Sequence, residues 1–114
     1  MSDCLFCKVA SGQIPAKIVH QDADVVAFED IHPQAPVHVL VVPRKHLPTL
    51  NDLQPADDGL VGKMLRTAAL VAAQRGIAER GWRAVMNVNR EGGQIVFHVH
   101  LHVLGARQMG WPPG

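Results

Sequence analysis

The sequence predicts an α+β domain built on an antiparallel sheet, and three observations lead to this expectation. The chain has 114 residues, 47% of them hydrophobic, which suits a single domain over residues 1–114 with a core of its own. Five segments have strand-like composition, and most follow one another directly. One long segment, residues 55–75, has apolar side chains at helical spacing. Consecutive strands with one inserted helix favour an antiparallel α+β fold over alternating βαβ units.

The first half of the chain is expected to contain a short helix and three strands. Residues 4–10 form the helix, with Ser2 or Asp3 as its cap and Gly12 as its end. The strands are rich in apolar and β-branched residues and cover residues 17–21, 25–28 and 37–42. Pro43 ends the third strand.

The second half is expected to contain the long helix and two more strands. Apolar residues recur along one helix face at Leu60, Met64, Ala68 and Val71. Gly76 follows the last turn, as is typical of a helix end. Strands at residues 82–88 and 96–104 bring the sheet to five strands.

Charge and hydropathy exclude several classes of partner. The net charge is +1, and no run of Lys or Arg is present, so polymeric nucleic acid is not an expected partner. The amino terminus lacks the apolar stretch of a signal peptide, and no segment has the roughly 20 apolar residues of a membrane span. We therefore expect a cytoplasmic protein that does not enter a membrane.

Residues 96–104 alternate strictly between two kinds of side chain. In a strand, His98, His100 and His102 lie about 7 Å apart on one face, opposite the apolar residues between them. Three interpretations follow: a solvated strand face, a three-histidine metal site of the kind that holds catalytic zinc, or nucleotide chemistry with one imidazole as nucleophile. The clean aliphatic row on the other face argues against a solvated strand face, and a three-histidine metal site usually draws its ligands from different strands, so the nucleotide interpretation is favoured.

The loop before this row contains paired glycines, Gly92 and Gly93. Such a pair often does no more than make a turn, but it also lets backbone N–H groups approach a phosphate. Its position shortly before the histidines favours a phosphate-binding loop over a simple turn.

Several motifs resemble one known family. The segment from His98 to Leu104 resembles the signature of the histidine-triad family. Other segments resemble its Hint branch, the histidine-triad nucleotide-binding proteins, so that the resemblance covers essentially the whole chain. These segments are Ile14-Pro15-Ala16-Lys17-Ile18, Phe28-Glu29-Asp30-Ile31, Pro33-Gln34-Ala35-Pro36, Gly92-Gly93-Gln94 and the tail from Gln108 to Gly114.

The resemblance implies a fold, an assembly and an activity. It implies a histidine-triad fold with one long and one short helix, and a homodimer whose sheets join edge to edge. It also implies phosphoramidase activity on purine nucleotides, with adenosine 5′-monophosphoramidates or aminoacyl-adenylates cleaved to AMP (or GMP analogues to GMP) through a nucleotidyl-histidine intermediate. No cofactor is expected for this chemistry. Two alternatives stay open: an enzyme for dinucleoside polyphosphates, and a regulatory adaptor whose hydrolysis is incidental.

The resemblance also assigns roles to individual residues. His100 matches the nucleophile, His102 the histidine that contacts the phosphate, and Asp30 the carboxylate that holds the ribose hydroxyls. His38 matches a position near the triad, although a satisfied core histidine is the alternative. The expected walls of the purine pocket are Leu5, Phe6, Val9, Ile14, Glu29, Ile31 and Leu40. The expected phosphate neighbours are Asn87, Gly93, Gln94 and Val96.

One position departs from the family. Many relatives carry Ser or Thr directly after Gly-Gly-Gln, where the hydroxyl assists the leaving group, but this chain has Ile95. The proton for the leaving group must therefore come from elsewhere, with His102 and water as candidates.

Two further features carry expectations of their own. Cys4, Cys7, His46 and His98 resemble the set that holds structural zinc in some bacterial relatives, and the alternative is two cysteines packed as small apolar residues. The tail, residues 106–114, is expected to lie near the dimer partner's site, because Met109 and Trp111 have no evident place in one subunit. A disordered terminus is the alternative.

Overall fold

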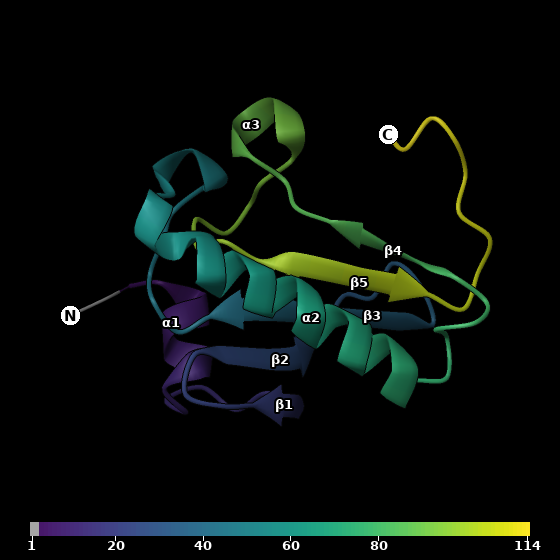
Figure 1. Ribbon diagram of the computed structural model, residues 1–114, viewed down its shortest axis with the longest axis horizontal. Helices are drawn as coiled ribbons and strands as arrows, with labels where there is room; N and C mark the ends of the chain where they lie inside the picture. The colour runs from purple at the N-terminus through teal and green to yellow at the C-terminus, as the bar shows by residue number, and fades with distance from the viewer. Residues whose placement is uncertain (1–2) are drawn as a thin grey trace.

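A five-stranded antiparallel sheet with the strand order β1-β2-β3-β5-β4 organises the chain (Figure 1). The computed structural model describes residues 3–114. The strands are β1 Ile18–Gln21, β2 Val25–Glu29, β3 Val37–Pro43, β4 Trp82–Val85 and β5 Leu101–Gly105. The predicted α+β class and antiparallel sheet are confirmed.

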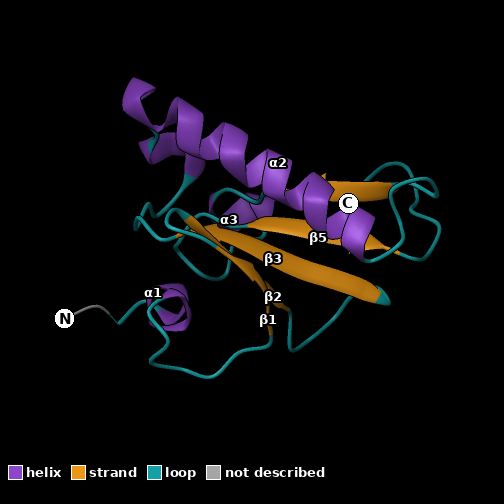
Figure 2. Cartoon of the chain, turned by 60° about the horizontal axis from the view of Figure 1, so that its bottom comes forward, coloured by secondary structure: helices purple, strands orange, loops and turns teal. Residues whose placement is uncertain are grey.

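Helices cover the two faces of the sheet, as Figure 2 shows. The long helix α2, Asp58–Gln74, packs on one face, and the short helix α1, Leu5–Ala10, lies against the other. Alternation along β2 and β3 divides the apolar residues between two cores. The core between α2 and the sheet, called here the α2 core, includes Val25, Ala27, Val39, Val41, Met64, Val71, Leu101 and Val103. The smaller core under α1 includes Phe6, Val9, Val26, Phe28, Leu40 and Val42.

The two predicted helices form, with different starts. α2 begins later than expected, because residues 50–52 and 55–57 form two short 3-10 turns before it. α1 is capped by Cys4, whose Sγ accepts a hydrogen bond from the Cys7 N–H at 3.3 Å, so the expected cap at Asp3 is wrong. Ser2, the other expected cap, lies outside the described residues.

The predicted strand at 96–104 is shorter than expected and begins only at Leu101. The reason lies in its neighbour. In the β3–β5 register Val41 faces Leu101, so Pro43 would face Val99, and proline has no N–H to continue the ladder. The Val99 N–H instead donates to the Leu47 carbonyl, at 2.7 Å. The alternation nevertheless holds, because Val99 is buried in the α2 core.

The segment between β4 and β5 also differs from expectation. β4 ends at Val85 rather than residue 88, because its partner β5 begins only at Leu101 and Val85 already pairs with His102. A short helix that was not expected, α3 Asn89–Gly92, follows. Among residues 3–114, no helix has the length and apolar character needed to cross a membrane.

Candidate active site

A cavity of about 600 Å³ opens between α1, the end of β2, the loop after α3 and the histidine segment. It brings together residues that lie far apart in the sequence. The predicted site residues that line it are Leu5, Phe6, Val9, Ile14, Glu29, Asp30, Ile31, His38, Leu40, Asn87, Gly93, Val96, His100 and His102. Fourteen of the twenty lining residues are thus among those predicted.

His100 is presented to this cavity in one defined protonation form. Its Nδ1 lies 2.7 Å from the carbonyl oxygen of His98. A carbonyl only accepts, so Nδ1 carries the proton and Nε2 keeps its lone pair. Burial lowers the pKa of His100, which favours this neutral form. A neutral imidazole with a fixed lone pair is what a histidine nucleophile needs.

His102 receives its orientation from His38. The Gln34 N–H donates to His38 Nδ1 at 2.9 Å, so the proton of neutral His38 is on Nε2. That Nε2 lies 2.9 Å from His102 Nδ1, which therefore accepts and leaves the proton of His102 on its own Nε2. Burial, followed by the neighbouring histidines, lowers the pKa of His102 to about 4. His102 is a neutral donor near pH 7.

Asp30 stands just after β2 with its carboxylate held in place. Its Oδ1 accepts the His32 N–H at 2.8 Å, and its Oδ2 lies 3.4 Å from His38 Nε2. The side chain is partly buried and lines the cavity beside Ile31. A carboxylate fixed in this way keeps lone pairs free to accept hydroxyl protons.

The loop after α3 lines the cavity with its backbone, whereas the side chain of Gln94 points away from the cavity. Gly93 ends α3 with φ +83°, a conformation that favours glycine, and it lines the cavity. The Gln94 amide is turned inward: its Oε1 accepts the Asn89 N–H, and its Nε2 donates to the Pro48 and Val96 carbonyls. Gln94 thus braces the loop and is not among the lining residues.

Some lining residues were not predicted. Ile95 lines the cavity with 88% of its surface exposed, whereas the sequence shows only that a hydroxyl is missing at this position. The other unpredicted lining residues are Pro15, Ala16, Phe28, His32 and Gln34. Phe28 could have been found, because alternation along β2 places it on the same face as Asp30. Gln34 acts through its backbone, which leaves no signal in the sequence.

Comparison with known proteins decides the family. A model of the HIT domain matches residues 11–109. The chain belongs to the HIT family. It is 47% identical over 108 residues to the purine nucleoside phosphoramidase of Escherichia coli K12, covering 95% of this chain and 91% of the relative.

Solved structures of HIT proteins have the same fold. A HIT family hydrolase from Legionella pneumophila Philadelphia 1 superimposes with a TM-score of 0.97 at 52% identity, covering 98% of this chain and 100% of the other. A histidine triad protein from Clostridium difficile gives a TM-score of 0.93 at 37% identity, with 96% of each chain covered.

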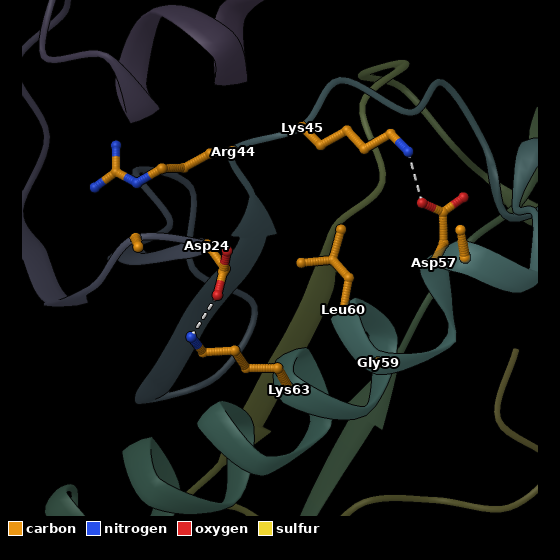
Figure 3. Close-up of a pocket in the computed structure, with 9 residues that line it drawn as sticks. Asp24, Arg44, Lys45, Asp57, Gly59, Leu60 and Lys63 are labelled. Atoms are coloured by element: carbon orange, nitrogen blue, oxygen red, sulfur yellow. Dashed lines mark hydrogen bonds and ion pairs between the residues drawn. The ribbon is translucent and has the colours of Figure 1, made fainter.

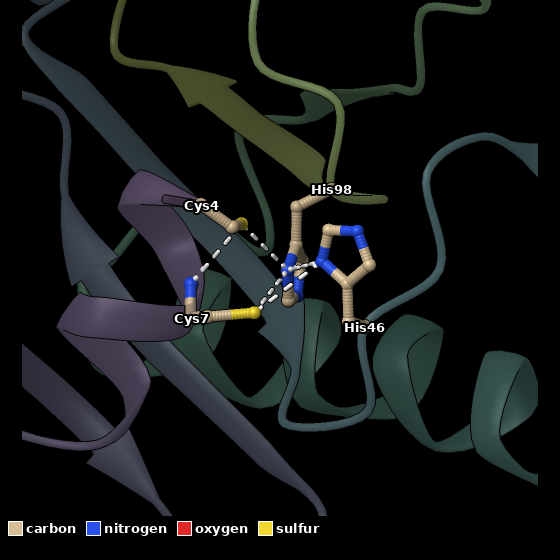
Figure 4. Close-up of side chains that lie close together, drawn as sticks. All are labelled: Cys4, Cys7, His46 and His98. Atoms are coloured by element: carbon tan, nitrogen blue, oxygen red, sulfur yellow. Dashed lines mark hydrogen bonds between the residues drawn. The ribbon is translucent and has the colours of Figure 1, made fainter. Parts of the chain in front are cut away.

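The HIT protein also gathers the predicted cysteine–histidine set, Cys4, Cys7, His46 and His98 (Figure 4). The donor atoms lie close together: Cys4 Sγ is 3.3 Å and Cys7 Sγ 3.4 Å from His98 Nδ1. His46 Nδ1 lies 3.3 Å from Cys7 Sγ and 3.2 Å from His98 Nδ1. Two thiols and two imidazoles are a donor set that suits tetrahedral zinc.

The protonation of His98 supports the same interpretation. Its Nε2 lies 2.7 Å from the Pro43 carbonyl and therefore carries the proton, which leaves the Nδ1 lone pair facing the sulfurs. A metal-bound histidine normally donates its second N–H in this manner. His98 thus faces the cysteines and is not among the residues that line the large cavity, although the alternation pattern placed it in one row with His100.

A second group has metal-type donors but lacks the histidine lone pair that a metal needs. It consists of Asp30, His38 and His102. The Gln34 N–H occupies Nδ1 of His38, so Nε2 of neutral His38 carries a proton and has no lone pair for a metal. The group is better described as a chain of hydrogen bonds.

A second cavity, of about 440 Å³, lies at the start of α2 (Figure 3). Its cations already have partners. Lys45 Nζ lies 2.7 Å from Asp57, and Lys63 Nζ lies 2.7 Å from Asp24. The Arg44 guanidinium donates to the Ala10 carbonyl at 2.6 Å. Both lysines are therefore ion-paired, and the Arg44 guanidinium already donates to carbonyl and amide oxygens, which leaves few donors for a phosphate.

Proposed function

We propose that this HIT protein is a purine nucleoside phosphoramidase that acts through a nucleotidyl-His100 intermediate. Its substrates are adenosine 5′-monophosphoramidates or aminoacyl-adenylates, and the nucleotide product is AMP. The observation that carries the proposal is the 2.7 Å bond from His100 Nδ1 to the His98 carbonyl, which leaves Nε2 as a nucleophile at the cavity. The name of the relative from Escherichia coli K12, which is 47% identical, supports the substrate class.

The reaction divides into two displacements at phosphorus. Nε2 of His100 attacks the α-phosphorus, a P–N bond to the ring forms, and the bond to the leaving group breaks with its electron pair. The leaving group is the amine of a phosphoramidate, which takes up a proton from water, or the carboxylate of an aminoacyl-adenylate. Water then attacks the same phosphorus and releases AMP and the free imidazole. The Nε2–H of His102 is available to a phosphate oxygen or to the departing nitrogen, because His38 holds Nδ1.

Turnover on a panel of adenylates tests this function. We expect AMP and free amine from adenosine 5′-phosphoramidates, and slower or no cleavage of dinucleoside polyphosphates. The reverse preference would support the alternative enzyme branch. Tight AMP binding without turnover on any phosphoramidate would support the regulatory adaptor instead.

Asp30 is proposed to bind the ribose hydroxyls. Loss of hydrogen bonds to a charged group costs about 1.5–3 kcal/mol, so AMP should bind about ten- to a hundredfold more tightly than 2′,3′-dideoxy-AMP. Asp30→Asn should remove most of this difference, whereas Asp24→Asn, at an exposed carboxylate outside the cavity, should retain it. Titration calorimetry with both nucleotides measures the difference. Equal affinity of the wild type for AMP and its dideoxy analogue would refute the role.

We further propose a homodimer in which the tail of one subunit reaches the site of the other. β4 stands at one edge of the sheet, where a second sheet can pair. The tail runs beside this edge, because Arg83 of β4 donates to the Gly110 carbonyl at 2.9 Å. Trp111 remains 83% exposed in the single chain and has Arg83 over its ring at 5.9 Å. An exposed tryptophan at an open sheet edge favours burial against a partner.

Removal of residues 108–114 tests the role of the tail. The truncated protein should remain a folded dimer, since these residues lie outside the sheet and both cores. Its kcat/KM should change unequally among substrates with different amines, because the tail is proposed to lie beside the leaving group. Steady-state kinetics on several phosphoramidates, with light scattering for mass, provide the readout. Wild-type kinetics on every amine would exclude the tail from the site.

A structural zinc ion is the last part of the proposal. Cys4, Cys7, His46 and His98 would hold it, and it would supply a rigid link between α1 and the two histidine segments. It would take no part in phosphorus chemistry.

A further inference from the structure

The set Cys4, Cys7, His46 and His98, called here the cysteine–histidine centre, touches the proposed active site at two points. The first is His98 itself. Its ring belongs to the centre, and its backbone carbonyl accepts a hydrogen bond from the His100 Nδ1–H at 2.7 Å. One residue therefore connects the centre to the protonation form of the proposed nucleophile.

The position of that carbonyl depends on side-chain anchoring. Residues 96–100 precede β5 and lie outside the sheet ladder, so strand pairing does not fix them. The backbone is held nearby by the bond from Val99 N–H to the Leu47 carbonyl. The His98 ring adds a second anchor: it is fully buried, with Nε2 on the Pro43 carbonyl and Nδ1 among the sulfurs. Loosening the centre frees one side of this ring.

The second point of contact is α1. Phe6 lies between the two cysteines, and its ring meets the His100 ring edge-on with centroids 5.0 Å apart. Leu5 and Val9 of the same helix also line the cavity. A helix of six residues is too short to be stable alone, so its position depends on its attachments. Cys4 and Cys7 form attachments at its first turn.

We propose that the cysteine–histidine centre positions both the nucleophile, His100, and the part of α1 that lines the purine pocket. An intact centre is therefore needed for full turnover and for full nucleotide affinity. The inference rests on the proposed function of His100. Cys4, Cys7, His46 and His98 are positioning residues in this scheme, because they act through the His98 carbonyl and through Phe6. When the contacts among these four side chains are lost, the His98 carbonyl no longer offers His100 Nδ1 a fixed acceptor, and α1 is free to move away from the cavity.

The test compares Cys7→Ser with a variant that loses stability elsewhere. Val71→Ala serves as the control, because Val71 is a buried residue of α2, on the face of the sheet opposite α1. Both variants are measured at temperatures equally far below their melting points. In Cys7→Ser we expect kcat to fall about tenfold or more, since a small misplacement of a reacting group is costly. We also expect weaker AMP binding, whereas Val71→Ala should retain both values.

A spectroscopic readout distinguishes positioning from general damage. In histidine-labelled protein, the hydrogen-bonded Nδ1–H of His100 should give a protected resonance in the wild type and in Val71→Ala. The same resonance should exchange rapidly in Cys7→Ser and in wild type treated with a chelator. If Cys7→Ser does not fold, His46→Asn replaces it, because His46 is the exposed member of the centre.

Either of two results would overturn the proposal. The first is a Cys7→Ser protein with wild-type kcat, AMP affinity and His100 resonance. The second is an equal loss in Val71→Ala, which would attribute the effect to stability. An error in the function of His100 is recognised separately, because His100→Ala would then retain turnover.

Discussion

Replacing His100 by alanine is expected to lower kcat by about ten-thousandfold or more, as does removal of other covalent nucleophiles. AMP affinity should change little, because the other residues proposed to bind the base, ribose and phosphate still line the cavity. The reason is specific: in the described structure the Nε2 of His100 is freed for attack by its Nδ1 bond to the His98 carbonyl. Single-turnover kinetics and calorimetry with AMP measure the two effects separately.

The control is another histidine. His20 lies in β1, pairs with Asp22 at 3.3 Å and does not line the cavity, so His20→Ala should have wild-type kinetics. If His100→Ala retained substantial turnover on phosphoramidates, the assignment of the nucleophile would be wrong.

The second large effect is expected from loss of the zinc site. Protein purified without a polyhistidine tag should contain about one zinc ion per chain, the stoichiometry of a closed four-ligand site. Cys4→Ser should lower both the zinc content and the melting temperature. Structural zinc binding in small domains contributes about 10 kcal/mol or more, and each kcal/mol is worth a few degrees at this chain length. Complete loss of the zinc would thus correspond to about 30 °C or more, and a fall of at least about 10 °C is expected even if the three remaining ligands keep part of the zinc.

Metal analysis and calorimetry of wild type, Cys4→Ser and His20→Asn provide the measurement. His20→Asn removes a histidine outside the centre and should retain zinc. Wild-type protein that is free of zinc and as stable as its Cys4→Ser variant would show that the cysteines only pack as small apolar residues.

The parts of the fold that the sequence predicted are those set by hydrophobic periodicity. Val99, Leu101 and Val103 pack under α2, as their alternation with the histidines indicated. The extent of the strand was wrong because it depends on a partner: Pro43 cannot continue the ladder opposite Val99. The short helix α3 was missed because a side chain from outside it, Gln94, bonds its first residue.

The candidate site shows a similar division. Family resemblance supplied most of the lining, from Leu5 to His102, because those positions are recognised by residue type. It could not supply the protonation forms, which are set by backbone groups. The Gln34 N–H fixes His38, and the His98 carbonyl fixes His100, yet neither group has a signature in the sequence. The separation of His98 from the other two histidines likewise follows from the Pro43 carbonyl and the cysteines.

Trapping the intermediate tests the central claim most directly. Wild-type protein is mixed with a slowly hydrolysed adenosine 5′-phosphoramidate, quenched within the first turnover, digested and sequenced by mass spectrometry. The account predicts an adenylyl group on the peptide that contains the histidine segment, attached to His100. An adenylyl group on another residue, in protein that turns over normally, would contradict it.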